Sequence, residues 1–122
     1  MKVSVCKTFR FDAAHYLPNY KGKCSRLHGH TWTLEVEVEG SVAVVSGFVI
    51  DFVTLKEIVQ PLIDVLDHYC LNDIVINPTC ENLLDYVWFY LSGQMRGVTE
   101  GVVTLTRLRL HETPDSFAEL RA

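Results

Sequence analysis

The stretch TLEVEVE, residues 33–39, decides the fold class, because apolar and charged side chains alternate along it one by one. Successive side chains of an extended chain point to opposite faces, so this alternation predicts a strand with one apolar and one carboxylate face. The apolar face consists of Leu34, Val36 and Val38, and the other of Glu35, Glu37 and Glu39. Such a row of carboxylates needs solvent or basic neighbours beside it.

A second alternating stretch precedes this strand. Residues 3–11 place four apolar side chains on one face, with Lys7 as the exception, and are predicted to form a half-buried strand. Residues 18–26 contain the turn-forming string PNYKGK and are predicted to form a polar loop between the two strands.

The middle of the chain changes to a helical period. Apolar residues recur at steps of three and four over residues 52–66, which predicts a helix that Pro61 kinks or shortens. A second helix is predicted to begin after Thr79, its N-cap, and to end near Gly93 and Gly97.

Residues 102–111 return to strand character, but the apolar parity changes between Leu105 and Leu108. A β-bulge, or a strand buried on both faces, would explain this change. Residues 117–121 are predicted to add a short last strand. The order of elements predicts an α+β fold, in which a four-stranded antiparallel sheet carries two helices on one face, as a single domain over residues 1–122.

The composition fits a chain that folds around its own core. Its 122 residues are 48% hydrophobic and 21% charged, which excludes a disordered or low-complexity chain. The net charge of −4 disfavours a partner such as nucleic acid. The first residues lack the apolar segment of a secretory signal, and no apolar run approaches the roughly 20 residues that span a bilayer. We therefore expect a cytoplasmic protein with free thiols and no membrane partner.

His28-Gly29-His30 is the strongest local signal for chemistry. Residues i and i+2 of an extended chain project to the same face, so both imidazoles can bind one ion. Catalytic zinc typically takes three protein ligands and leaves one position open, and His15 at the end of the first strand is the candidate for the third ligand. The alternative is a chance pair of ordinary surface histidines.

Cys24 lies four residues before His28, and three interpretations stay open. The thiol could be a fourth zinc ligand in a closed structural site. It could instead stay free as a base or nucleophile whose pKa is lowered by the nearby cation. It could also be an inert loop cysteine.

Two further groups of polar residues are candidates. Asp67 beside His68 could fix the imidazole tautomer and raise its basicity, although neighbours in sequence rarely bond side chain to side chain, and a polar helix end is the simpler interpretation. Glu112 follows an apolar strand near the sheet edge. Its carboxylate is either solvated or placed in a pocket, where it could hold a guanidine-like edge by two parallel hydrogen bonds.

Six strings together resemble the family of 6-pyruvoyl-tetrahydropterin and 6-carboxy-tetrahydropterin synthases. In order these are FDAAH (11–15), Cys24-x-x-x-His28-Gly29-His30, VIDF (49–52), LDHYCLND (66–73), NPTCEN (77–82) and HET (111–113). The three-residue gap between the cysteine and the HGH motif is similar to that of the carboxy-forming branch, which serves queuosine and archaeosine synthesis.

The resemblance implies a role for each matched residue. His15, His28 and His30 would bind Zn²⁺, and Cys24 would be the proton acceptor. Further, Asp67 and His68 would activate that thiol, often across a subunit boundary. The carboxylate of Glu112 would anchor the pterin, and Thr79 would help to line the pocket. The fold implied is the ββααββ tunnelling fold, assembled as a homo-oligomeric barrel, a trimer or a dimer of trimers.

The activity implied is a zinc-dependent lyase acting on 7,8-dihydroneopterin triphosphate. The carboxy-forming enzyme would release triphosphate and acetaldehyde, whereas the pyruvoyl-forming enzyme would release triphosphate without cleaving the chain. A non-catalytic zinc-binding assembly domain is the alternative from another class. Lys21, Lys23 and Arg26 are the cations nearest to Cys24 in sequence that could meet the triphosphate.

Overall fold

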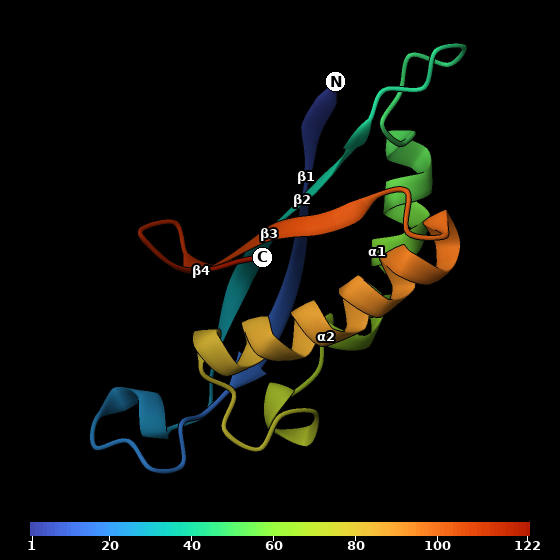
Figure 1. Ribbon diagram of the computed structural model, residues 1–122. Coiled ribbons are helices and arrows are strands. Elements are labelled where there is room, and N and C mark those ends of the chain that lie inside the picture. The colour runs from blue at the N-terminus through green and yellow to red at the C-terminus, as the bar shows by residue number, and fades with distance from the viewer.

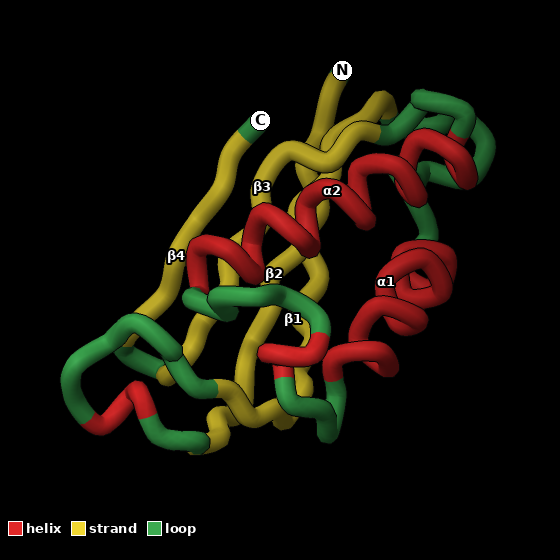
Figure 2. Tube along the Cα trace, turned by 90° about the horizontal axis from the view of Figure 1, so that it is seen from below, coloured by secondary structure: helices red, strands yellow, loops and turns green.

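An antiparallel sheet in the order β1-β2-β3-β4 carries two helices on one face, as predicted (Figure 1). The computed structural model describes residues 1–122. Its elements are β1 (Lys2–His15), β2 (His28–Ser41), α1 (Phe52–Leu66), α2 (Cys80–Thr99), β3 (Thr104–Thr113) and β4 (Ser116–Arg121), with short 3-10 turns at Lys23–Ser25 and Leu71–Asp73. Figure 2 shows both helices lying on the same side of the strands.

The core fills the space between the sheet and the helices. It is a single cluster of 23 buried residues, to which the alternating strands contribute one face each. The predicted apolar row of β2 is completely buried, as Leu34, Val36 and Val38 each have 0% exposure. This burial explains why the alternation in residues 33–39 is so regular.

The carboxylates of β2 lie on the face of the sheet that carries no helix, the open face, where basic side chains are close to them. Arg107 of β3 lies 3.1 Å from Glu37, and Arg109 of β3 lies 2.7 Å from Glu119 of β4. His111 Nε2 lies 2.7 Å from the carboxylate of Glu35. The expected basic partners of Glu35 and Glu37 are therefore supplied by the next strand, β3.

The parity change in the third strand is a β-bulge. Glu37 pairs with Arg107 and the next residue, Val38, pairs with Leu105, so Thr106 is the extra residue. Its hydroxyl bonds to the Glu37 carboxylate at 2.9 Å, which gives the bulged residue a partner. The bulge keeps Leu105 and Leu108 both on the buried face.

Both long strands extend further than predicted. The β1 strand runs to His15, and β2 begins at His28, so the sheet includes the histidines themselves. Small residues and glycine have weak strand propensity, which is why the pattern alone ended the first strand too early and began the second too late. The ladder between β1 and β2 continues to the pair His15–His28.

Both helices also differ from prediction at one point each. The α1 helix spans the predicted residues 52–66 and continues for five residues past Pro61, so the prediction that this proline shortens it is wrong. Buried residues after the proline hold this last turn, among them Leu62 and Leu66. The α2 helix passes through Gly93 and Gly97 and ends at Thr99, because buried Met95 anchors its last turns.

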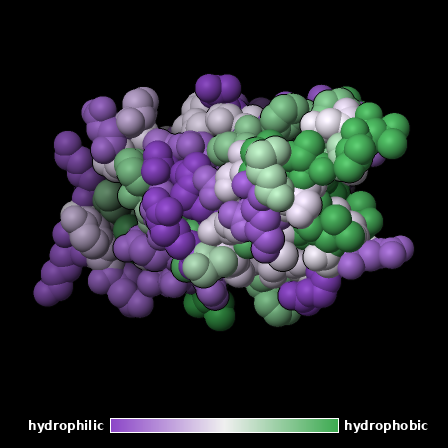
Figure 3. All heavy atoms as spheres, turned by 45° about the horizontal axis from the view of Figure 1, so that its top comes forward, coloured by the Kyte–Doolittle hydropathy of each residue, from purple (hydrophilic) through white to green (hydrophobic).

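The N-cap of α2 is confirmed, since the Thr79 hydroxyl accepts a hydrogen bond from the backbone N–H of Asn82 at 3.1 Å. All four cysteines are free. Neither α1 nor α2 combines the length and the apolar character needed to cross a membrane. Figure 3 shows hydrophobic side chains gathered at one end of the viewed face and hydrophilic ones at the other.

Candidate metal centre

The strand pattern places three histidines and one glutamate on the same side of the sheet. Odd residues of β1, such as Phe9 and Phe11, face the core, and His15 continues their parity. Even-numbered residues of β2 face the core, and His28 and His30, at the start of this strand, have the same parity. After the bulge, Leu108 and Leu110 of β3 are buried, so Glu112 follows on this side too.

These four side chains form one cluster. The ligand atoms of His15, His28, His30 and Glu112 all lie within 4.8 Å of one another. The three imidazole centroids are 4.6 to 5.2 Å apart. The side chain of Glu112 reaches the cluster through Oε1, which lies 3.1 Å from His15 Nε2 and 3.4 Å from His30 Nε2.

Backbone carbonyls orient two of the imidazoles. His15 Nδ1 lies 2.8 Å from the carbonyl oxygen of Pro78, and His28 Nδ1 lies 2.7 Å from that of Arg26. A carbonyl oxygen only accepts, so Nδ1 carries the proton in both rings and the lone pair of Nε2 faces the cluster. Metal-binding histidines are typically held in this way.

The nitrogens that face the cluster lack hydrogen bonds. His15 Nε2 and His30 Nε2 are buried, and neither makes a hydrogen bond, although Glu112 Oε1 lies 3.1 Å from the first and 3.4 Å from the second. Burial lowers the pKa of His30, and the neighbouring His15 and His28 lower it further, against the opposing effect of Glu112. Neutral imidazoles with unused lone pairs suit a cation of the zinc type.

Trp32 closes the cluster from the core side. Its ring makes edge contacts with His15 and His30 at centroid distances of 5.1 and 5.4 Å, and its Nε1 donates to the Ala13 carbonyl at 3.2 Å. The side chain of His15 is completely buried as a result. The histidines are therefore held on rigid strands against a packed aromatic residue.

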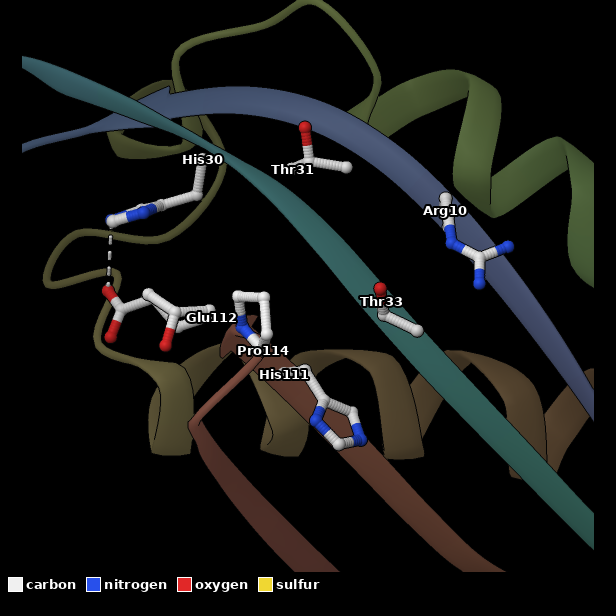
Figure 4. A pocket seen from close by; sticks show the side chains of 8 residues that line it. Arg10, His30, Thr31, Thr33, His111, Glu112 and Pro114 are labelled. Atoms are coloured by element: carbon white, nitrogen blue, oxygen red, sulfur yellow. Dashed lines mark ion pairs between the residues drawn. The ribbon is translucent and has the colours of Figure 1, made fainter.

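A pocket of about 460 Å³ opens beside the cluster, where β2 and β3 separate. The β2–β3 ladder ends at the pair Thr33–His111, whereas the β1–β2 ladder continues to His28. The pocket lies in the gap that opens between β2 and β3 beyond this pair, and it is named the fork pocket. It therefore connects the open face of the sheet with the helix-covered face. Its lining comes from both faces, as Figure 4 shows, and consists of Arg10, His30, Thr31, Thr33, His111, Glu112, Thr113 and Pro114.

Asp67 and His68 form a direct pair, although they are neighbours in sequence. His68 Nδ1 lies 2.8 Å from Asp67 Oδ2, and Asp67 Oδ1 accepts the backbone N–H of Asp12 at 2.8 Å. The expectation that adjacent side chains do not bond is wrong here, because His68 has a left-handed backbone with φ of 61°. Both side chains lie near the end of β1, and His68 lines a second pocket together with His30.

The pair also shifts the titration of both groups. The hydrogen bond that His68 donates to Asp67, followed by the charge of Asp67, raises the pKa of His68. The backbone N–H of Asp12, followed by the bond from His68, lowers the pKa of Asp67. Asp12, Asp67 and His68 bring their ligand atoms within 4.8 Å of one another, but this group is largely exposed.

The substitution Asp67→Asn tests this pair. It keeps an oxygen that can accept the Asp12 N–H but removes the charge, so the pKa of His68 is expected to fall toward about 6.5, its value without partners. Proton NMR titration of the five histidines measures this shift. Asp64→Asn, an exposed change on α1 that bonds only Gln60, is the control. An unchanged His68 titration in Asp67→Asn would show that the pair does not form.

Two predicted site residues lie outside the histidine cluster. Cys24 lies in the turn Lys23–Ser25 between β1 and β2, half-buried, and its thiol is not among the clustered ligand atoms. Thr79 lies next to Pro78, the residue that holds His15, and lines a separate small pocket with Asn77. Within one chain, neither these two residues nor Asp67 and His68 contribute to the cluster of His15, His28, His30 and Glu112.

Several residues near the site were not found from the sequence. Pro78 and Arg26 take part through their carbonyls, which no side-chain pattern reveals. Cys80 donates to the Leu110 carbonyl at 3.1 Å and ties the start of α2 to β3, while burial raises the pKa of its thiol to about 11. Arg10 and Thr33 line the pocket, and only the register between β1 and β2 could have placed them together.

Comparison with known proteins gives consistent matches. A sequence model of the family described as 6-pyruvoyl tetrahydropterin synthase matches residues 4–122. Dihydroneopterin monophosphate aldolase of Pyrococcus furiosus is 39% identical over 120 residues, 98% of each chain. 6-Carboxy-5,6,7,8-tetrahydropterin synthase of Haemophilus influenzae is 30% identical over 141 aligned positions, covering 94% of this chain and 96% of the relative.

The fold agrees as well. The structure of Caenorhabditis elegans 6-pyruvoyl tetrahydropterin synthase superimposes with a TM-score of 0.87 and 25% identity, over 100% of this chain and 96% of that one. These relatives are named as pterin enzymes and match almost the full length, which favours an enzyme over a non-catalytic assembly domain. The resemblance found in the sequence is confirmed, and the chain belongs to the 6-pyruvoyl tetrahydropterin synthase family of enzymes.

Proposed function

We propose that the chain is a zinc-dependent lyase that converts 7,8-dihydroneopterin triphosphate and water into 6-carboxy-5,6,7,8-tetrahydropterin, acetaldehyde and triphosphate. The observation that carries the proposal is the cluster of three imidazoles, two of which present Nε2 lone pairs fixed by carbonyls. Three neutral histidine nitrogens suit zinc among the common metals. When bound there, zinc would act as a Lewis acid and acidify the side-chain hydroxyls of the substrate.

Cys24 would remove the proton from the substrate side chain. Its thiol lies outside the histidine cluster, where the fourth group is Glu112, and this supports a free thiol rather than a fourth ligand. His68, held by Asp67, would help to keep the thiol deprotonated, because the pair favours a charged imidazole. The exposure of His68 supports a proton relay in which the Asp67–His68 pair and Cys24 come from different subunits.

Glu112 would hold the pterin. Only its Oε1 contacts the imidazoles, so Oε2 can accept from the amino and ring N–H edge of the substrate. Thr79 would contribute from the start of α2. Its oxygen already accepts from Asn82, so its O–H proton remains for the substrate.

A homo-oligomer, either a trimer or a dimer of trimers, would complete these sites. The sheet has two edges, β1 and β4, and exposed edges favour pairing with another chain. We expect the reaction in the cytoplasm, where the four free thiols would stay reduced, and its product would serve queuosine or archaeosine synthesis.

Two related activities are the alternatives. The pyruvoyl-forming reaction would release triphosphate without acetaldehyde. Aldol cleavage of dihydroneopterin monophosphate is favoured by one specific observation, the 39% identity to the aldolase of that name. Aldol cleavage would leave the phosphate on the released two-carbon aldehyde, so no inorganic phosphate would appear.

Product analysis separates these activities. The zinc-loaded protein is incubated with either 7,8-dihydroneopterin triphosphate or the monophosphate, and pterins are identified by chromatography with mass spectrometry. The proposal predicts a 6-carboxy pterin from the triphosphate and little turnover of the monophosphate. A 6-pyruvoyl product, or rapid cleavage of the monophosphate alone, would overturn it in favour of the corresponding alternative.

A further inference from the structure

We propose that Arg10 and Thr33 bind the phosphoryl tail of the substrate, at the opposite side of the fork pocket from Glu112. This inference rests on the proposed function for the identity of the substrate. It assigns the phosphoryl contact to the sheet rather than to the loop cations beside Cys24.

Arg10 differs from the other arginines on the open face by having no partner. Arg107, Arg109 and Arg121 each lie within 4 Å of a glutamate of β2 or β4. No ion pair, hydrogen bond or aromatic contact involves the Arg10 guanidinium. An unpaired guanidinium in a pocket suits an anionic ligand, because its planar fork matches phosphate oxygens.

The carboxylates nearest to Arg10 along the sheet are already engaged. Glu35 bonds His111 at 2.7 Å and lies within 4 Å of Arg107 and Arg109. The carboxylate of Asp12 accepts the hydroxyl of Thr31. Neither acid forms an ion pair with Arg10, so its charge remains for a ligand.

Thr33 stands directly opposite Arg10 in the β1–β2 register, and His111 stands opposite Thr33 in the β2–β3 register. Arg10, Thr33 and His111 therefore form the last row of paired residues before β2 and β3 separate. The Thr33 hydroxyl makes no hydrogen bond, unlike that of Thr31, so it can donate to a phosphoryl oxygen.

One side of the pocket therefore presents a carboxylate, which accepts hydrogen bonds, and the other side presents a positively charged guanidinium. Figure 4 shows Glu112 and His30 together on one side, and Arg10 with Thr33 on the other. A substrate with a hydrogen-bond-donating ring and an anionic tail matches this polarity. Arg10 is the only lysine or arginine in the lining, and none of Lys21, Lys23 and Arg26 takes part in it.

Binding of inorganic tripolyphosphate, measured by calorimetry on the full-length protein, tests this assignment without turnover. Arg10→Gln is expected to weaken binding by about 10- to 100-fold, since a charge-assisted pair of hydrogen bonds is lost. Arg10→Lys should restore part of the affinity, and Thr33→Val should weaken it by about fivefold. Arg96→Gln is the matched control, because Arg96 is exposed on α2 and forms no ion pair.

Kinetics distinguish a phosphoryl contact from a general structural role. Arg10→Gln should raise KM for 7,8-dihydroneopterin triphosphate while leaving inhibition by unphosphorylated dihydroneopterin unchanged. Wild-type protein that does not bind tripolyphosphate, equal losses in Arg10→Gln and Arg96→Gln, or loss of dihydroneopterin inhibition would each overturn the assignment. If the triphosphate is bound through Arg10 but gives no product, the proposed function fails and the phosphoryl site stands.

Discussion

His28→Ala is expected to lose the bound metal and the turnover together. His28 supplies one of three Nε2 lone pairs, and its orientation is fixed by the Arg26 carbonyl. Even loss of a residue that only orients a ligand costs about 10- to 100-fold in metal affinity, so loss of the ligand itself should cost more. Turnover should fall by about a thousandfold or more, because a bound metal supplies several kcal/mol of charge stabilisation and about 4 kcal/mol corresponds to that factor.

Metal content per chain, measured by plasma mass spectrometry after dialysis, tests the predicted loss of metal in His28→Ala. His28 is only partly buried, unlike His15, so circular dichroism is expected to show an intact fold. His68→Ala is the control for metal binding: it should keep one metal per chain and lose turnover. Metal retained by His28→Ala but lost by His68→Ala would place the ion at the Asp12, Asp67 and His68 group instead.

Cys24→Ala is expected to keep the metal and lose turnover by about 100- to 10,000-fold, the range that a positioned base contributes. The reason is that the thiol would act on the substrate and not on the ion. The half-buried position of Cys24 in a short turn makes a large loss of stability unexpected. Rates with 7,8-dihydroneopterin triphosphate and metal content are measured on the same sample.

Cys6→Ala is the matched control for this variant. Cys6 is exposed on the open face of β1, where Arg107 lies beside its thiol, and it is not part of the histidine cluster, so Cys6→Ala should change neither turnover nor metal content. Loss of metal in Cys24→Ala would instead identify the thiol as a fourth ligand and the site as closed. Full turnover with full metal content would make Cys24 an inert loop residue.

The alternation over residues 33–39 of β2 made the sheet predictable, because a two-residue period is typical of a strand and the buried side chains of this stretch are all apolar. The bulge at Thr106 was visible as a change of parity for the same reason. The ends of elements were less predictable. Tertiary packing decided them, since buried Met95 carries α2 through two glycines that would otherwise weaken it.

The three clustered histidines were predictable because the spacing of His28 and His30 and the end of the first strand are local properties of an extended chain. The approach of Glu112 to the imidazoles was not, because it depends on how far β2 and β3 separate after the pair Thr33–His111. The Asp67–His68 contact depended on one left-handed residue, which no sequence pattern at that position indicates.

The ratio of acetaldehyde to inorganic triphosphate, released from 7,8-dihydroneopterin triphosphate by the zinc-loaded protein, tests the proposed reaction most directly. The carboxy-forming lyase predicts one acetaldehyde for each triphosphate, with both signals absent in Cys24→Ala. Triphosphate released without acetaldehyde would contradict it and identify a pyruvoyl-forming enzyme, and release of neither would exclude both activities.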